Sequence, residues 1–386
     1  MDFSRVELSP EDQEFYDQFR EFIGEHVTDE VRRIDRETGE NFSEPLHLAL
    51  GEAGYLTSDW KQESEGGFDP VQRRIFHLEI GRAHAPWFHW GTTGVVARLM
   101  QQFGAPELVD AVLPGVLSGE IRLCLGYTEP EGGSDVATCK TRAVRDGDGW
   151  VINGSKMFTS NAQNAKYVFL LTNTDPQGRK HRNLTMFLVP LDSPGIEIQG
   201  IRTLDGDRTN IVYYSDVRVD DRYRIGEVNG GWTVMRFALD AEHGITEAVD
   251  HGLQNISMMS EHGHLMAEAA DGVAAAVAQT ADDSVRYRLG RSMARIEAAL
   301  STPGMYGRVA LIQTMREVSP ELMDLLGAAS ALPTDTTGSA DFADNGAIEF
   351  IFRHAVPAGI YGGSLEVFRN MIAQHELKLG RPSYGA

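Results

Sequence analysis

The spacing of apolar residues divides the chain into a helical first part, a β part and a second helical part. Ser9-Pro10 is a helix-start signal. It precedes apolar residues at helical spacing, Phe15, Phe19, Phe22 and Ile23. Further helices are predicted over four segments, 43–53, 70–84, 88–103 and 106–118. We therefore predict an N-terminal helical domain over residues 1–120.

The pattern changes near residue 121 to short, β-branched or aromatic segments bounded by turn residues. The predicted strands include 150–152, 167–171, 184–189 and 211–214. Asp146-Gly147-Asp148-Gly149 and Asn153-Gly154 are predicted as hairpin-type turns on either side of the first of these strands. This part is predicted to be a middle β domain over residues 121–226.

Helical spacing returns at Gly231-Trp232 and is interrupted by a small, polar, loop-like stretch over 333–340. A C-terminal helical bundle is therefore predicted over residues 227–386. Together the three parts predict an α+β fold in which a β layer lies between helical bundles of one subunit.

Composition narrows the function classes. The chain has 386 residues, 42% of them hydrophobic, and a formal net charge of -21, which argues against nucleic-acid binding. No apolar run is long enough to cross a membrane and the start is polar and acidic, so we expect a cytoplasmic protein without membrane association. The two cysteines, Cys124 and Cys139, are too few for a disulfide framework or a zinc cluster, and no metal site is predicted.

Tyr127-Thr128-Glu129-Pro130-Glu131-Gly132-Gly133-Ser134-Asp135 resembles the T-E-P-x-x-G-S-D signature of acyl-CoA dehydrogenases. Gly132 and Gly133 allow close backbone approach, and Ser134 with neighbouring N–H groups suits a pyrophosphate. Alone, the segment reads equally well as an ordinary turn of small residues. The resemblance implies FAD contacts from Tyr127, Thr128, Gly133 and Ser134.

A second segment, Asn153 to Asn161, resembles the family's N-G-x-K-x-W-x-[ST] element. The resemblance implies that Phe158, in place of the commoner Trp, packs on the flavin. Ser160 would bond near flavin N5, and Thr159 is included in the same contact. Two such elements at this separation on a β domain favour a flavin site over two unrelated turns.

A third segment, Ile360 to Arg369, resembles the loop and helix that close over flavin and thioester in the family. Ser364 and Glu366 are thereby implied as flavin contacts and Gly362 as a substrate contact. The family's usual catalytic glutamate follows the Tyr of this loop, but here that position is Gly362, which cannot take a proton.

A minority of the family carries the base on the first C-terminal helix, in a motif like L-[DN]-x-E-R. Leu239-Asp240-Ala241-Glu242-His243 matches except at His243. Glu242 borders an apolar stripe formed by Val234, Ala238, Ala241, Ile245 and Ala248. Desolvation there would raise the pKa of a carboxyl as a general base requires, whereas Glu247 lies on the polar side. The competing interpretation is a helix-boundary residue in an ordinary salt bridge.

The R-x-x-F-G element, which reaches a neighbour's FAD in homomeric members, is absent between Gly272 and Ala299. This combination resembles the heteromeric acyl-CoA dehydrogenases of bacterial sterol side-chain breakdown, in which two different chains share FAD. The resemblance implies a homologous partner subunit in an α2β2 assembly and an acceptor such as electron-transfer flavoprotein.

The predicted function is FAD-dependent α,β-dehydrogenation of an acyl-CoA thioester, with a bulky or steroid side-chain acyl group favoured by Gly362. Two alternatives stay open. One is a non-catalytic subunit of a heteromeric acyl-CoA dehydrogenase, and the other is a flavin oxidase or monooxygenase of the same fold.

Overall fold

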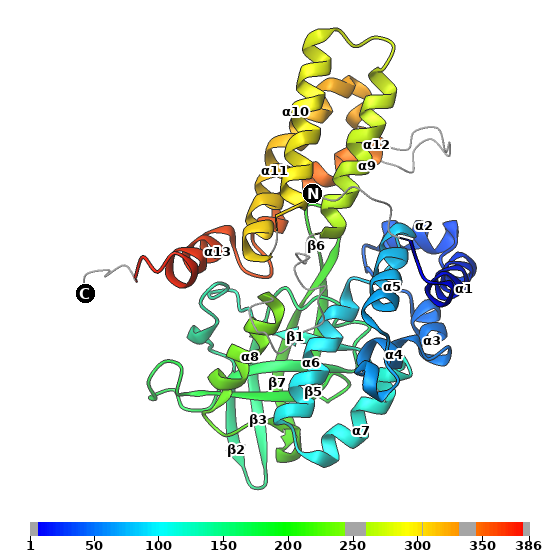
Figure 1. Cartoon of the computed structure of the whole chain (residues 1–386). Helices are drawn as coiled ribbons and strands as arrows, with labels where there is room; N and C mark the ends of the chain where they lie inside the picture. The colour runs from blue at the N-terminus through cyan, green and yellow to red at the C-terminus, as the bar shows by residue number, and fades with distance from the viewer. Residues whose placement is uncertain (1–6, 244–259, 303, 332–344, 381–386) are drawn as a thin grey trace. The chain divides into compact units, whose positions relative to one another are not determined.

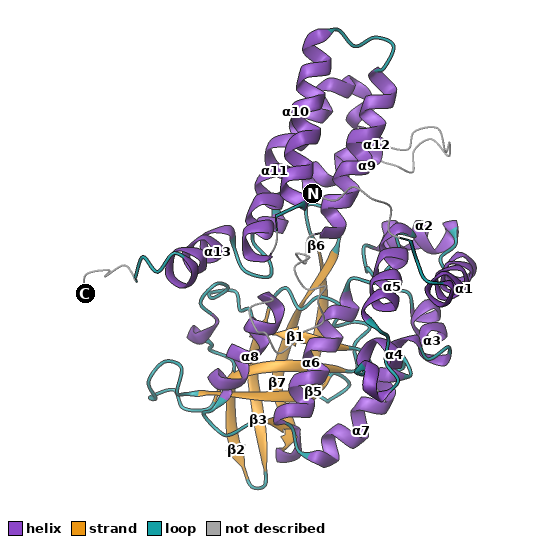
Figure 2. Ribbon diagram, viewed as in Figure 1, coloured by secondary structure: helices purple, strands orange, loops and turns teal. Residues whose placement is uncertain are grey.

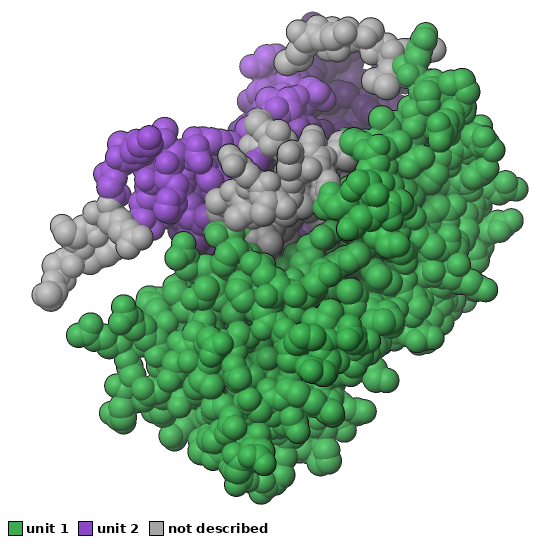
Figure 3. Space-filling view, turned by 60° about the horizontal axis from the view of Figure 1, so that its bottom comes forward, with its two compact units in different colours: residues 1–202, 206–241 green, residues 203–205, 242–386 purple. Residues whose placement is uncertain are grey.

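A computed structural model describes residues 7–243, 260–302, 304–331 and 345–380. The chain divides into two compact units, shown in Figure 3. Residues 1–202 and 206–241 form the first unit, and residues 203–205 and 242–386 form the second. Each unit is described separately below. The limits 1–120, 121–226 and 227–386 of the three expected domains stay predictions.

The first unit begins with helices whose starts are set by local chemistry. Ser9 caps the first helix by accepting a hydrogen bond from the N–H of Asp12, and Asp69 forms a capping box with Gln72. These helices are α1 (Pro10–His26), α2 (Asp29–Thr38), α3 (Glu44–Glu52), α4 (Tyr55–Trp60), α5 (Pro70–Arg82), α6 (His89–Phe103) and α7 (Pro106–Leu117). The expected N-terminal helices are confirmed within one or two residues at their ends.

An eight-stranded sheet follows, drawn in orange in Figure 2. Its strands are β1 (Leu123–Gly126), β2 (Arg142–Asp146), β3 (Gly149–Lys156), β4 (Tyr167–Asn173), β5 (Leu184–Pro190), β6 (Ile196–Arg202), β7 (Arg208–Asp220) and β8 (Arg224–Ile225). The strand order is β6-β7-β3-β2-β4-β5-β8, and β1 pairs in parallel with β4. All four expected strands are present, and β2 and β3 form the hairpin expected at Asp146–Gly149.

The expected turn at Asn153-Gly154 is wrong. β3 continues through it as an irregularity, with the register on β7 shifting between Ile152 and Gly154. Gly154 has φ +147, and a Cβ there would lie 2.7 Å from the Cα of Thr141. Asn153 exchanges hydrogen bonds of 2.9 and 3.0 Å with Asp216 of β7. The partner strand therefore holds this Asn-Gly pair as a bulge rather than letting it reverse the chain.

Strands β4 and β5 are apolar on both faces because each face meets a different core. Phe169 and Met186 join the core of the N-terminal helices, whereas Val168 and Phe187 join a second core with β3 and β7. Helix α6 is fixed to the sheet because Thr93 Oγ1 bonds both the carbonyl (3.2 Å) and the N–H (3.3 Å) of Leu123. Figure 1 shows α6 passing along the sheet near β1. This contact joins helices and strands into one body.

Helix α8 (Gly231–His243) begins in the first unit. The second unit holds α9 (Ser260–Val277), α10 (Asp283–Leu300), α11 (Gly304–Leu326), α12 (Asn345–His354) and α13 (Leu365–Met371) around a separate apolar core. The expected loop over 333–340 lies outside the described residues. No helix within the described ranges is both long and apolar enough to span a membrane. The predicted order of helical, β and helical parts is confirmed.

Candidate functional site

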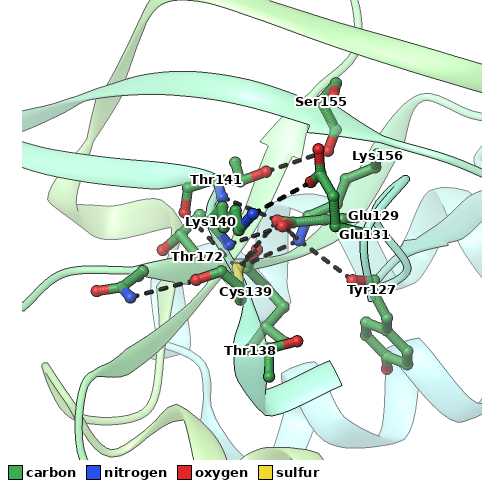
Figure 4. A network of polar contacts seen from close by, with 12 residues as sticks. Tyr127, Glu129, Glu131, Thr138, Cys139, Lys140, Thr141, Ser155, Lys156 and Thr172 are labelled. Carbon is green, nitrogen blue, oxygen red and sulfur yellow. Dashed lines mark hydrogen bonds and ion pairs between the residues drawn. The ribbon is translucent and has the colours of Figure 1, made fainter. Parts of the chain in front are cut away.

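A buried ion pair connects the first two motifs, as Figure 4 shows. Lys156 is the last residue of β3, and Glu129 follows β1. The Lys156 Nζ donates to Glu129 Oε1 at 2.8 Å and to the carbonyl of Tyr127 at 3.2 Å. The Lys156 and Glu129 side chains are 0% and 6% exposed. The T-E-P motif and the N-G-x-K motif therefore meet through their charged residues.

The Glu129 carboxylate is satisfied from several sides. It accepts from the N–H of Lys140 at 2.7 Å and of Thr141 at 2.8 Å, and the Cys139 thiol lies 3.2 Å away. Burial opposes ionisation, but the Lys156 charge and the hydrogen bonds of Lys156 and Thr141 outweigh it and hold the pKa of Glu129 at about 2. Burial also raises the pKa of Cys139 to about 12, so this thiol keeps its proton. Both cysteines are buried and free.

A backbone contact brings the two expected flavin-binding loops side by side, because the N–H of Met157 donates to the carbonyl of Thr128 at 2.9 Å. Tyr127 is buried beside Phe169, and Thr128 is half-buried. Gly133 and Ser134 lie on the exposed part of the turn that follows. The structure thus gathers the first-motif residues and the end of β3 at one place on the sheet.

Phe158 has an unusual conformation in this place. Its φ is +59, a region that disfavours bulky side chains, and the residue is 55% exposed. The next residue, Thr159, is fully buried. Its N–H donates to the Asn210 carbonyl and its carbonyl accepts from the Asn210 side chain, both at 2.9 Å, while the Thr159 Oγ1 has no hydrogen-bond partner among the described residues. Ser160 Oγ lies 3.0 Å from Thr209 Oγ1. The buried anchor at Thr159 holds the Phe158 ring outward despite its strained backbone.

The third motif lies in the second unit. Gly362 and Gly363 have φ of +59 and +93. Ser364 caps α13 by accepting from the N–H of Val367, and Glu366 is exposed and 3.9 Å from Arg369. The Ser364 hydroxyl therefore caps a helix, a role that the flavin hypothesis did not include. Its predicted flavin contact and that of Glu366 stay predictions.

Buried Arg308 fixes this loop. Its Nη2 donates to the carbonyl of Tyr361 at 2.5 Å and lies 3.4 Å from that of Gly363, while the guanidinium stacks 4.8 Å from the Phe368 ring centroid. A trans peptide directs its C=O and N–H to opposite sides. A cation on the Tyr361 carbonyl therefore orients and polarises the N–H of Gly362, away from Arg308.

Glu242 lies in α8, on the turn after the buried residues Val234 and Ala238. These two confirm the start of the expected apolar stripe. The side chain of Glu242 lies outside the described residues, as does Glu247 entirely. The assignment of Glu242 as the base stays a prediction.

Sequence reasoning did not find Glu129, Lys156 or Arg308 as site-building residues. A signal existed for the first two, because both are charged residues inside the motifs that mark this site, Glu129 in the T-E-P segment and Lys156 in the N-G-x-K segment. For Arg308 the sequence offers only an arginine near the start of a long helix, and its contact with a loop 53 residues later is a tertiary fact.

Two comparisons of sequence place the chain in a family. Residues 9–120 match the acyl-CoA dehydrogenase N-terminal domain, and residues 124–220 match the acyl-CoA dehydrogenase middle domain. The acyl-CoA dehydrogenase IpdE1 of Mycolicibacterium smegmatis is 33% identical over 364 residues, which cover 88% of this chain and 88% of that protein.

Solved structures agree. The steroid ACAD Tcur3481-Tcur3483 has a TM-score of 0.80 and 29% identity, covering 98% of this chain and 100% of that chain. The ChsE4-ChsE5 complex from Mycobacterium tuberculosis has a TM-score of 0.79 and 27% identity, with coverage of 98% and 100%. The predicted fold and enzyme class are confirmed. The chain is a member of the acyl-CoA dehydrogenase family of oxidoreductases.

Proposed function

We propose that the chain is the catalytic subunit of an FAD-dependent enzyme that introduces an α,β double bond into a bulky acyl-CoA thioester. The observation that carries this proposal is the joining of the two flavin-type motifs by Lys156 and Glu129, next to an exposed aromatic ring at Phe158. Two unrelated turns would have no reason to share a buried ion pair.

The residues present fit a flavin. Phe158 offers an apolar ring face, and Thr128 and Ser160 offer hydroxyls on adjacent loops. Gly133 and Ser134 add an exposed, small-residue turn suited to a pyrophosphate. Tyr127 and Thr159 are the buried residues of the two loops. A strained, exposed ring held in place by a buried neighbour is typical of a ligand contact. FAD, when bound, supplies the acceptor for the hydride that leaves the β carbon.

The protein's own groups handle the proton and the thioester. Glu242 takes the α proton, a task for which the border of an apolar face suits a carboxylate. The N–H of Gly362, oriented through Arg308, donates to the thioester carbonyl and stabilises the charge that develops there. In this proposal Glu242 accepts the α proton, and the N–H of Gly362 binds the thioester oxygen.

Two observations support a large acyl group and a second subunit. The related structures named above are a steroid ACAD and a two-component complex. In α10, all four arginines are engaged by carboxylates of the same unit: Arg286 by Asp283, Arg288 by Glu321 and Asp324, Arg291 by Glu321, and Arg295 by Glu317. The carboxylates of the same unit would therefore compete with a cofactor phosphate of a neighbour for these arginines. We propose that a homologous partner supplies that contact in an α2β2 assembly, with electron-transfer flavoprotein or a similar acceptor downstream.

The test is co-production with candidate partners, followed by flavin quantification and assay of enoyl-CoA formation with an artificial acceptor. Glu242→Gln should lower turnover by about 10²- to 10⁴-fold, while Asp240→Asn on the same helix should change it little. Unchanged turnover in Glu242→Gln would remove this residue from the chemistry. Hydrogen peroxide without enoyl product would instead favour an oxidase.

If the chain purified alone retains stoichiometric FAD and full activity, the proposal of a partner subunit is contradicted. That result would leave the reaction class intact.

A further inference from the structure

Arg122 is a buried cation with no acidic side chain paired to it among the described residues. It lies directly before β1, is 3% exposed, and stacks 4.9 Å from the ring centroid of Phe42 and 6.0 Å from that of Trp90. Its Nη1 contacts the His47 ring, at 2.7 Å from Nδ1. No carboxylate in the described part of the chain pairs with this guanidinium, and its Nε has no hydrogen-bond partner. The Nε edge of the guanidinium is therefore unused.

Its neighbours do not neutralise the charge. Burial, together with the Arg122 charge, lowers the pKa of His47 to about 2 and that of His89 to about 3, so both rings are neutral near pH 7. His89 Nε2 is also buried and has no hydrogen-bond partner in the described ranges. The remaining walls are the aromatic rings of Trp87 and Trp90. One uncompensated positive charge is thus enclosed by neutral groups, an arrangement that costs stability and is typical of functional sites.

Strand β1 sets the separation between the Arg122 charge and the proposed flavin-binding loop. The carbonyl of Arg122 accepts from the N–H of Lys166 at 2.9 Å, and β1 runs from Leu123 to Gly126 before the flavin-type loop at Thr128. At about 3.3 Å per residue, Arg122 is roughly 20 Å from Thr128 along the strand. A ligand that spans both positions has to be long or polycyclic.

We propose that Arg122 anchors a carboxylate at the far end of the acyl group, so that the substrate class is a CoA thioester of a long or polycyclic acid with a second carboxylate. The guanidinium edge that carries the unpaired Nε has the fork geometry that binds a carboxylate through two hydrogen bonds. This inference rests on the proposed function for the position of the thioester. The anchor itself depends only on the surroundings of Arg122.

The test measures binding rather than turnover. Two probes are compared by calorimetry on the complete chain with its partner, without electron acceptor: the CoA monothioester of hexadecanedioic acid and the same thioester as its methyl ester. The carboxylate probe should bind about 10- to 100-fold more tightly. Arg122→Gln should abolish this difference and leave the methyl ester within about 3-fold. Arg20→Gln, at an exposed arginine of α1, should keep it.

Equal affinities of the two probes for the unmodified protein would overturn the proposal, as would a preference that survives in Arg122→Gln. Free hexadecanedioate tests the other source of a carboxylate by thermal shift. Stabilisation that requires Arg122, without discrimination between the thioesters, would overturn the acyl assignment and assign the subsite to a free anion.

The two proposals fail in different ways. A carboxylate preference that persists when no acyl-CoA is dehydrogenated would overturn the proposed reaction and retain the subsite. Dehydrogenation with no such preference would overturn the subsite alone.

Discussion

Two buried cations lie in the same unit, and their surroundings are opposite. Lys156 is fully buried and bonded to Glu129, to the Tyr127 carbonyl and to the Cys139 sulfur. Arg122 is equally buried, yet it meets neutral histidine and aromatic rings. Lys156 is paired with a carboxylate of the same chain, whereas Arg122 has no carboxylate partner in the part of the chain that the structure describes.

The difference separates a structural role from a binding role. A buried charge that is fully hydrogen-bonded within the protein fixes the positions of the loops around it. It has no donor left for a ligand. A buried charge with an unused donor destabilises the folded protein, and binding of a group of opposite charge would offset that cost. Removing the two cations should therefore change stability in opposite directions.

The largest effect is expected for Lys156→Met. Glu129 would be left as a buried carboxylate without its cation, which should lower the free energy of unfolding by about 3–5 kcal/mol. Urea denaturation at pH 7.5 measures the change. The double variant Lys156→Met/Glu129→Leu should recover much of the loss, and a single variant that costs under about 1 kcal/mol would contradict the structural role.

The histidine beside Arg122 should make stability depend on pH. The folded-state pKa of His47 is about 2, below its ordinary 6.5, so the unfolded chain takes up a proton that the folded chain refuses. His47 therefore does not lower the free energy of unfolding above about pH 6.5. Below that pH its protonation in the unfolded chain lowers the free energy of unfolding, by about 2 kcal/mol at pH 5. Denaturation at pH 7.5 and 5.0 should show a smaller difference in His47→Gln. Replacement of the exposed His375 is the matched control. Identical profiles for His47→Gln and the unmodified chain would contradict the neutral ring.

Arg122→Met should stabilise the protein, in contrast to Lys156→Met. Methionine removes the enclosed charge and keeps most of the side-chain volume, so we expect a gain of about 1–2 kcal/mol at pH 7.5. The same denaturation series measures it. A loss larger than about 2 kcal/mol would show that the aromatic contacts already compensate the guanidinium, and the comparison between the two cations would fail.

The smallest effect is the acid dependence of the complete pair. The folded-state pKa of Glu129 is about 2, below its ordinary 4.5, so its contribution is complete above about pH 4.5 and is lost as the pH falls toward 2. The loss should be about 1 kcal/mol at pH 3.5. Subtracting the pH profile of Glu129→Gln from that of the unmodified chain isolates it. A difference that begins near pH 6 would contradict the assignment.

Much of the fold was predictable because its signals are local. The Ser9 cap, the apolar spacing of α1 and the Asp146–Gly149 hairpin each depend on residues within a few positions of one another. Asn153-Gly154 has the same local chemistry as a hairpin turn, and only the pairing of β3 with β7, about sixty residues away, made it a bulge. Local preference was overruled there by a distant strand.

The site was predictable in its motifs and not in its electrostatics. Phe158 and Ser160 were found from their neighbours in the sequence, and the structure places their loop beside Thr128. The enclosure of Arg122 depends on His47, which lies 75 residues earlier, and no pattern around either residue indicates burial. Sequence alone therefore identifies which loops matter and leaves open which charges are neutralised.

The left-handed backbone at Phe158 has a consequence for how the protein is made. The hydrogen bonds of Thr159 hold the neighbouring apolar ring outward, so the ring stays in contact with water until a ligand covers it. In the proposed enzyme, bound flavin would cover the Phe158 ring. Cofactor loading should therefore lower the apolar surface that the chain exposes during production.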